Sequence, residues 1–85
     1  MHKRATYDLA IGRTLKQLHG ERKAVRTKIA AALEITELAV TRIEIGEEKL
    51  TAGGLVLLLK LFNLSWDEFI GRVEANLPSA EADII

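Results

Sequence analysis

Apolar residues recur at helical spacing along most of this chain, and its single proline is Pro78. They do not alternate with polar residues as they would in half-buried strands, so the pattern predicts an all-α protein. With 85 residues and 48% apolar content, one domain is expected, whose core is marginal unless a second surface is also buried. We therefore expect one compact domain over residues 1–78 and a mobile C-terminal tail over residues 79–85.

Five helices are predicted, because breaks in the apolar pattern coincide with residues that favour helix ends. Thr6, Thr36, Thr51 and Ser65 each stand where an N-cap side chain is expected, and Gly46 stands where a helix end favours a left-handed residue. The expected helices are Tyr7–Glu21, Arg26–Leu33, Glu37–Ile45, a fourth from just after Thr51 to Phe62, and a fifth from just after Ser65 that Pro78 ends.

The apolar positions of each predicted helix identify the side that should face the core. The expected inward residues are Ile11, Leu15 and Leu18, then Ile29, Ala30 and Leu33, then Val40 and Ile43, then Leu55, Leu58, Leu59 and Phe62, and finally an apolar side of Trp66, Phe69, Ile70 and Val73.

Charge is distributed unevenly although the formal net charge is zero. Residues 1–28 hold eight basic and two acidic residues, a balance of +6, and the rest of the chain carries −6. A basic segment of this kind either faces phosphate or is simply solvated.

Several classes of protein are disfavoured by composition. The chain has no cysteine and two histidines, so neither disulfides nor a metal site is expected, and no cofactor is predicted. It contains neither a glycine-rich phosphate loop nor a recognisable nucleophile and base pair, so we expect no enzyme and no catalytic residues. No apolar run approaches the roughly 18 residues of a membrane span, and the expected location is the cytoplasm.

Residues 26–45 carry the pattern with the clearest functional meaning. Two short predicted helices are joined there by a tight link, as in a helix-turn-helix unit. The segments IAAALEIT, from Ile29, and VTRIEIGE, from Val40, resemble the repressor/Cro-like (XRE-type) helix-turn-helix family, and the likeness extends over about Ile11 to Ile70. It implies a compact, lambda-repressor-like bundle of five helices.

The resemblance further implies a dimeric transcriptional regulator that binds double-stranded DNA, with the third helix in the major groove, and therefore association with the nucleoid. On the family pattern, Arg26 matches a phosphate contact, whereas Glu37, Leu38 and Thr41 match positions that meet base edges. A carboxylate can accept a hydrogen bond from cytosine N4, and an aliphatic side chain can contact a thymine methyl. The complete set of expected DNA-binding residues is Arg26, Thr36, Glu37, Leu38, Thr41 and Arg42.

Three departures from the family pattern favour an alternative. Glu34 replaces the usual glycine of the turn and must take a strained backbone or alter the turn. Val25 replaces the usual serine or threonine cap of the second helix. The third helix is also unusually acidic and apolar, with Glu44 and Ile45 beside its predicted base contacts. The alternative is a protein-interaction module on the same fold, of the antitoxin or anti-repressor type, with weak or lost DNA binding and a protein partner.

The fourth predicted helix is apolar on more sides than a single core face requires. Leu57 and Leu61 are left over after the core side is assigned, so a second surface must be buried. A homodimer is the simplest explanation, and a different protein partner stays open. The expected interface residues are Leu57, Leu61, Trp66 and Ile70.

A pairing between His19 and Glu44 is also predicted. In the family, an arginine late in the first helix commonly pairs with the glutamate of the segment that matches Ile43 to Gly46, and here His19 takes the place of that arginine. A histidine bonds a carboxylate more strongly when charged, so the link would respond to pH. The alternative is that both side chains are solvated.

Overall fold

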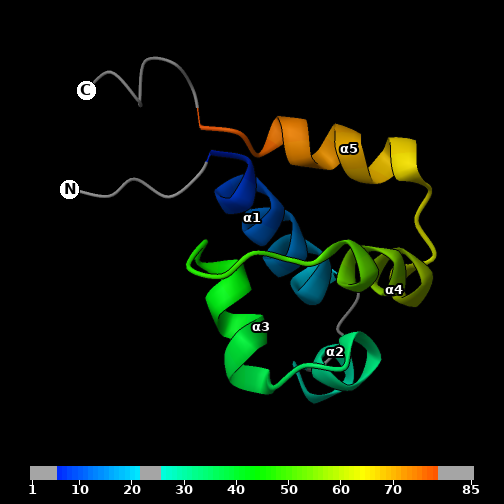
Figure 1. The fold of residues 1–85 in the computed structure, drawn as a ribbon. Coiled ribbons are helices and arrows are strands. Elements are labelled where there is room, and N and C mark those ends of the chain that lie inside the picture. The colour runs from blue at the N-terminus through cyan, green and yellow to red at the C-terminus, as the bar shows by residue number, and fades with distance from the viewer. Residues whose placement is uncertain (1–5, 22–25, 79–85) are drawn as a thin grey trace.

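The described part of the chain, residues 6–21 and 26–78 of a computed structural model, consists of five helices without strands. The predicted all-α class with five helices is confirmed. The helices are α1 (Thr6–Glu21), α2 (Arg26–Leu33), α3 (Glu37–Glu44), α4 (Ala52–Phe62) and α5 (Trp66–Ala75), as Figure 1 shows.

Three of the predicted N-caps are confirmed by hydrogen bonds. The side-chain oxygen of Thr36 accepts from the Ala39 amide at 3.0 Å, and the same geometry recurs at Thr51 and at Ser65. Each bond satisfies an amide that the first turn of a helix leaves without a partner, so the three helices begin where the sequence predicts.

Helix ends and turns depend on residues with positive φ. Gly46 has φ 81°, as predicted, and Glu34 has φ 60° in the link between α2 and α3. The strained backbone expected at Glu34 is therefore present, because a non-glycine residue is disfavoured in this left-handed region. Asn63 takes the same conformation, with φ 53°, at the C-cap of α4.

Some helix boundaries differ from the prediction. Thr6 is the first residue of α1 rather than its cap, and α3 ends at Glu44 with Ile45 as its C-cap. α5 ends at Ala75, ahead of Pro78, because Asn76 caps it and its amide reaches back to the last turn. The expected tail at 79–85 and the departure at Val25 lie outside the described residues.

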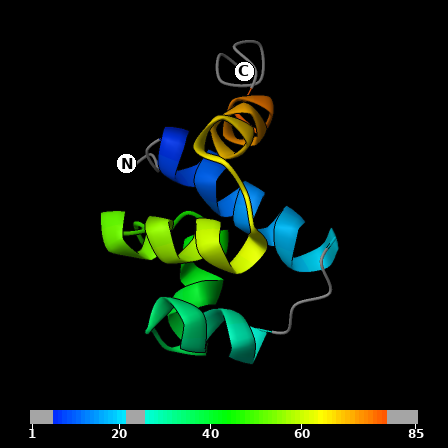
Figure 2. The same cartoon turned by 90° about the vertical axis from the view of Figure 1, so that its right-hand side faces the viewer.

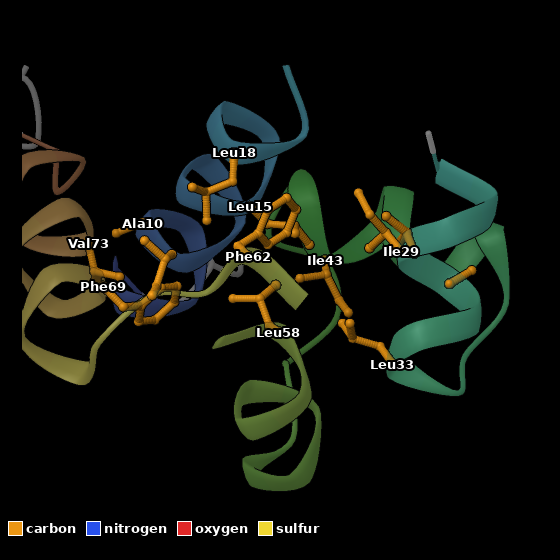
Figure 3. Packing of buried hydrophobic residues seen from close by; sticks show 13 residues of the cluster. Ala10, Leu15, Leu18, Ile29, Leu33, Ile43, Leu58, Phe62, Phe69 and Val73 are labelled. Carbon is orange, nitrogen blue, oxygen red and sulfur yellow. The ribbon is translucent and has the colours of Figure 1, made fainter. Parts of the chain in front are cut away.

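The core joins all five helices. α1 packs against α3 and α5, while α2 packs against α3 and α4. Figure 3 shows Leu15, Ile43, Leu58 and Phe62 meeting near the centre, where side chains from α1, α3 and α4 interlock. Most predicted inward residues are buried, and the buried apolar set is Ala10, Leu15, Leu18, Ile29, Ala30, Leu33, Val40, Ile43, Leu58, Phe62, Leu64, Phe69 and Val73.

A few inward predictions hold only in part. Ile11, Leu55, Leu59 and Ile70 are partly buried and pack at the margin of the core, whereas Trp66 is 53% exposed. Trp66 is the first residue of α5, so its ring rests at the edge of the core, with its centroid 6.5 Å from that of Phe69.

α1 and α3 approach each other closely at Gly12, which is buried. A Cβ atom built at Gly12 would overlap the carbonyl oxygen of Ile43 and lie 2.9 Å from that of Glu44. Any side chain there would therefore push the two backbones apart. This contact brings the end of α3 against α1, and the burial of Val40 and Ile43 leaves the other side of α3 facing outward.

Candidate functional site

The outer face of α3 consists of Glu37, Leu38, Thr41, Arg42 and Ile45. On the opposite side, Val40, Ile43 and Glu44 are buried. Glu37, Leu38, Arg42 and Ile45 are exposed, and Thr41 is half-buried. The structure thus brings four of the predicted DNA-binding residues, Glu37, Leu38, Thr41 and Arg42, onto one face.

α2 begins beside this face, so its first residues lie near the exposed side chains of α3. Three residues, Glu34 to Thr36, connect α2 to α3, and the two helices pack together. Figures 1 and 2 place α2 at the opposite end of the molecule from α5.

Glu37 is held by a residue that sequence reasoning missed. The Thr27 hydroxyl donates a hydrogen bond of 3.1 Å to Oε2 of Glu37, joining the first turn of α2 to the first turn of α3. The only signal in the sequence was a hydroxyl residue at the second position of α2, which carries no information about its distance from Glu37.

The hydroxyl groups of Thr36 and Thr41 already have local partners. Thr36 accepts from the Ala39 amide, and Thr41 donates to the carbonyl oxygen of Glu37 at 3.3 Å. Thr41 therefore directs its donor back to its own helix, which leaves acceptor lone pairs and a methyl group for a ligand. Both residues stay predicted DNA contacts, although the Thr36 oxygen already accepts one hydrogen bond and the Thr41 hydroxyl hydrogen is already donated.

Arg26, the predicted phosphate contact, also faces a buried carboxylate. Its Nη2 lies 3.7 Å from Oε1 of Glu44, and its side chain is 42% exposed. His19 contributes the closer contact, with Nδ1 2.9 Å from Oε2 of Glu44, whose side chain is 4% exposed. The predicted pairing of His19 with Glu44 is confirmed, and its response to pH stays a prediction.

Glu44 thereby joins the ends of α1 and α3 to the start of α2. A carboxylate removed from water needs hydrogen-bonding or charged partners, and these two side chains supply them. Arg26 is consequently held near the outer face of α3 while its side chain stays 42% exposed.

The residues predicted for a dimer interface differ in exposure. Leu61 is 37% and Trp66 53% exposed, on either side of the link between α4 and α5. Leu57 and Ile70 are partly buried and pack against the core, so they offer less surface. Val56, which sequence reasoning missed, is 52% exposed on α4.

Within the described residues, no helix has the length and apolar character to cross a membrane. The same residues contain no group of three or more histidine, cysteine or acidic side chains suited to hold a metal ion.

The exposed residues of α3 offer a carboxylate acceptor, aliphatic surface and a guanidinium donor on one short helix.

Comparison of the chain with models of protein families, with curated proteins and with solved structures found no match.

Proposed function

We propose that this chain is a sequence-specific double-stranded DNA-binding transcriptional regulator that acts as a dimer. In this proposal α2 and α3 form a helix-turn-helix, and α3 enters the major groove. The observation that carries it is the division of α3 into two sides. Val40 and Ile43 fix one side in the core, while Glu37, Leu38 and Arg42 stand exposed on the other.

The chemistry of the exposed side suits base edges. Major-groove edges present donors, acceptors and the thymine methyl, and each base pair has its own pattern. Glu37 supplies an acceptor, Leu38 an apolar contact and Arg42 a donor group. Arg26 and Lys28, both exposed at the start of α2, supply positive charge for phosphate.

Selection of bound sequences from a random duplex library tests the proposal directly. A shared motif is expected, arranged as two half-sites because the proposed regulator is a dimer. Bound DNA without enrichment over the starting library would contradict sequence-specific function.

Salt dependence tests the phosphate contact assigned to Arg26. Arg26→Ala should weaken binding to all duplexes similarly and reduce the slope of log affinity against log salt by about 1. The matched control is Lys60→Ala, which removes an exposed cation from α4 and should leave the slope unchanged. If both variants give the same slope of log affinity against log salt, Arg26 does not contact phosphate.

The proposed homodimer uses the exposed apolar residues at the link between α4 and α5. Leu61→Glu should convert the dimer to a monomer in analytical ultracentrifugation, because an unpaired charge in an interface costs several kcal/mol. Leu57 is a poorer position to test, since it also packs on the core. Lys60→Glu is the control, and a wild-type monomer at tens of micromolar would contradict the dimer.

A protein partner is the second candidate, and one observation favours it. Leu38 is 59% and Ile45 42% exposed, so the outer face of α3 carries unusual apolar surface. Binding of this kind would depend little on salt and would be lost in a Leu38→Ser, Ile45→Ser variant. If such a partner competes with duplex DNA for the chain, DNA and the partner share the outer face of α3, and both candidate functions are supported.

A further inference from the structure

We propose that Glu37 selects cytosine at one position of each half-site, and that Thr27 positions the Glu37 carboxylate for this contact. The inference rests on the proposed DNA-binding function and names one determinant of its specificity. Thr27 acts as a positioning residue and does not need to touch DNA.

The geometry begins with the hydrogen bond between the two side chains. Thr27 Oγ1 donates to Glu37 Oε2 at 3.1 Å, and both residues are exposed. Thr27 lies in the first turn of α2 and Glu37 is the first residue of α3, so the bond crosses from one helix to the other. A side chain with several rotatable bonds is thereby restricted before any ligand arrives.

The bond leaves one carboxylate oxygen available. An ionised carboxylate has about four lone-pair sites on its two oxygens, and the Thr27 hydroxyl occupies one of them. Within the described residues, Oε1 of Glu37 has no hydrogen bond. Leu38, the next residue of α3, is 59% exposed and offers apolar surface on the same outer face.

Cytosine is the base whose major-groove edge this oxygen fits best. Cytosine presents the N4 amino group as a donor, whereas guanine presents the N7 and O6 acceptors and thymine presents O4. A carboxylate accepts hydrogen bonds but donates none, so it is repelled by guanine and thymine at this position. Adenine has a donor at N6, but the neighbouring N7 acceptor opposes the second carboxylate oxygen.

Thr27 favours the same choice in a second way. Because its hydroxyl donates to Glu37, the carboxylate is partly satisfied and need not turn toward a cation of α2.

The negative charge of the Glu37 carboxylate also lowers the affinity for any polyanion through charge repulsion. The inference therefore predicts that Glu37 lowers overall affinity while it improves discrimination between bases.

The experiment is library selection followed by affinity measurements on the enriched site and its single-base variants. Wild type should prefer cytosine at one position by about fivefold or more, the lower end of what a good base contact supplies. Glu37→Gln should abolish that preference or shift it to adenine, because an amide can donate to N7 and accept from N6. Preferences at the other positions should persist.

Glu34→Gln is the matched control for charge, since Glu34 is an exposed acidic residue in the adjacent link. It should raise affinity for all duplexes without changing which base is preferred. Thr27→Val should reduce the cytosine preference, and Thr27→Ser, which keeps the hydroxyl, should retain it. Thermal unfolding of each variant shows whether the fold is preserved.

The outcomes separate this inference from the proposed function. If wild type enriches a motif but Glu37→Gln keeps every base preference, the cytosine contact is overturned and DNA binding stands. If Glu37→Gln behaves as expected while Thr27→Val keeps the cytosine preference, the positioning role is overturned. If wild type enriches no motif, the proposed function itself fails.

Discussion

α1 makes two contacts of different character, one with α3 and one with α5. Toward α3, the backbones meet at Gly12 and the carboxylate of Glu44 is buried against His19. Toward α5, Figure 3 shows Ala10 beside Phe69 and Val73, and polar side chains close the rim of this contact. The first contact has no room to adjust, whereas the second combines an apolar centre with a rim that water reaches.

The rim between α1 and α5 is organised by Asn76. Its Nδ2 donates to Thr14 Oγ1 at 3.1 Å and to the Arg72 carbonyl oxygen at 3.0 Å. Its backbone carbonyl oxygen accepts a hydrogen bond from Nη1 of Arg13. Thr14, which is fully buried, donates in turn to the Ala10 carbonyl oxygen. The contact of α1 with α3 therefore depends on a close backbone fit, while its contact with α5 depends on several hydrogen bonds that water can replace.

Gly12→Ala should produce the largest loss of stability. The new methyl group would overlap the Ile43 carbonyl oxygen, and both backbones must shift, so we expect a cost of about 3 kcal/mol or more. Chemical denaturation measures this change in the free energy of unfolding.

Gly20→Ala is the control on the same helix, where nothing lies within 4 Å of the added atom. It should be neutral or stabilise by up to about 1 kcal/mol, through the better helix propensity of alanine. Similar effects at both glycines would show that α1 and α3 are not in close backbone contact.

Glu44→Ala should be the next most damaging change. It removes the acceptor of His19 and the anion beside Arg26. Those two side chains are partly exposed and regain some hydration, so we expect a loss of about 2–4 kcal/mol rather than the upper range for a broken buried pair.

Equilibrium unfolding of His19→Ala, Glu44→Ala and the double variant gives the coupling between the two side chains. Glu74→Ala, an exposed acidic residue of α5, is the control and should change stability by less than about 0.5 kcal/mol. Additive effects at His19 and Glu44 would mean that the contact contributes nothing to folding.

Asn76→Ala should cost about 1–2 kcal/mol, because the buried Thr14 hydroxyl and the Arg72 carbonyl oxygen both lose the side-chain Nδ2 donor. Gln17→Ala, which removes a longer contact of 3.3 Å to the same amide, should have a smaller effect. A loss at Asn76 equal to that at Glu44 would contradict the distinction between the two contacts of α1.

Glu21→Gln should have the smallest effect. Its carboxylate lies 3.1 Å from Arg72 Nη1, but the two side chains are 44% and 26% exposed. Ion pairs of this kind contribute at most about 1 kcal/mol, and a carboxylate at the C-terminal end of a helix opposes the helix dipole. Denaturation in low and high salt should show a change under about 0.5 kcal/mol that salt removes. A larger change in stability that persists in high salt would mean that this ion pair contributes as strongly as the rigid contact between α1 and α3.

Features that depend on a few neighbouring residues were predicted well from the sequence. The N-caps at Thr36, Thr51 and Ser65 and the left-handed Gly46 follow from local backbone chemistry, whereas a strained Glu34 was one of two outcomes that the family pattern implied. The inward residues of α2 and α3 also followed, because helical spacing alone separates the two sides of a helix.

Features that depend on how helices meet were missed or came only from resemblance. Gly12 interrupts a helical pattern, which can indicate close packing, but the sequence does not say which backbone approaches it. Thr27 and Asn76 are polar residues that each bond a side chain 10 or more positions away. The pairing of His19 with Glu44 was predicted only because a family pattern names that position.

The backbone contact at Gly12 also has a kinetic consequence. Because α3 rests directly on α1, the helix cannot tilt or slide to fit a ligand without disturbing α1 as well. Its outer face is therefore preorganised, and binding orders little beyond a few side chains. We expect substitutions at Leu38 or Arg42 to change how long a complex lasts far more than how quickly it forms.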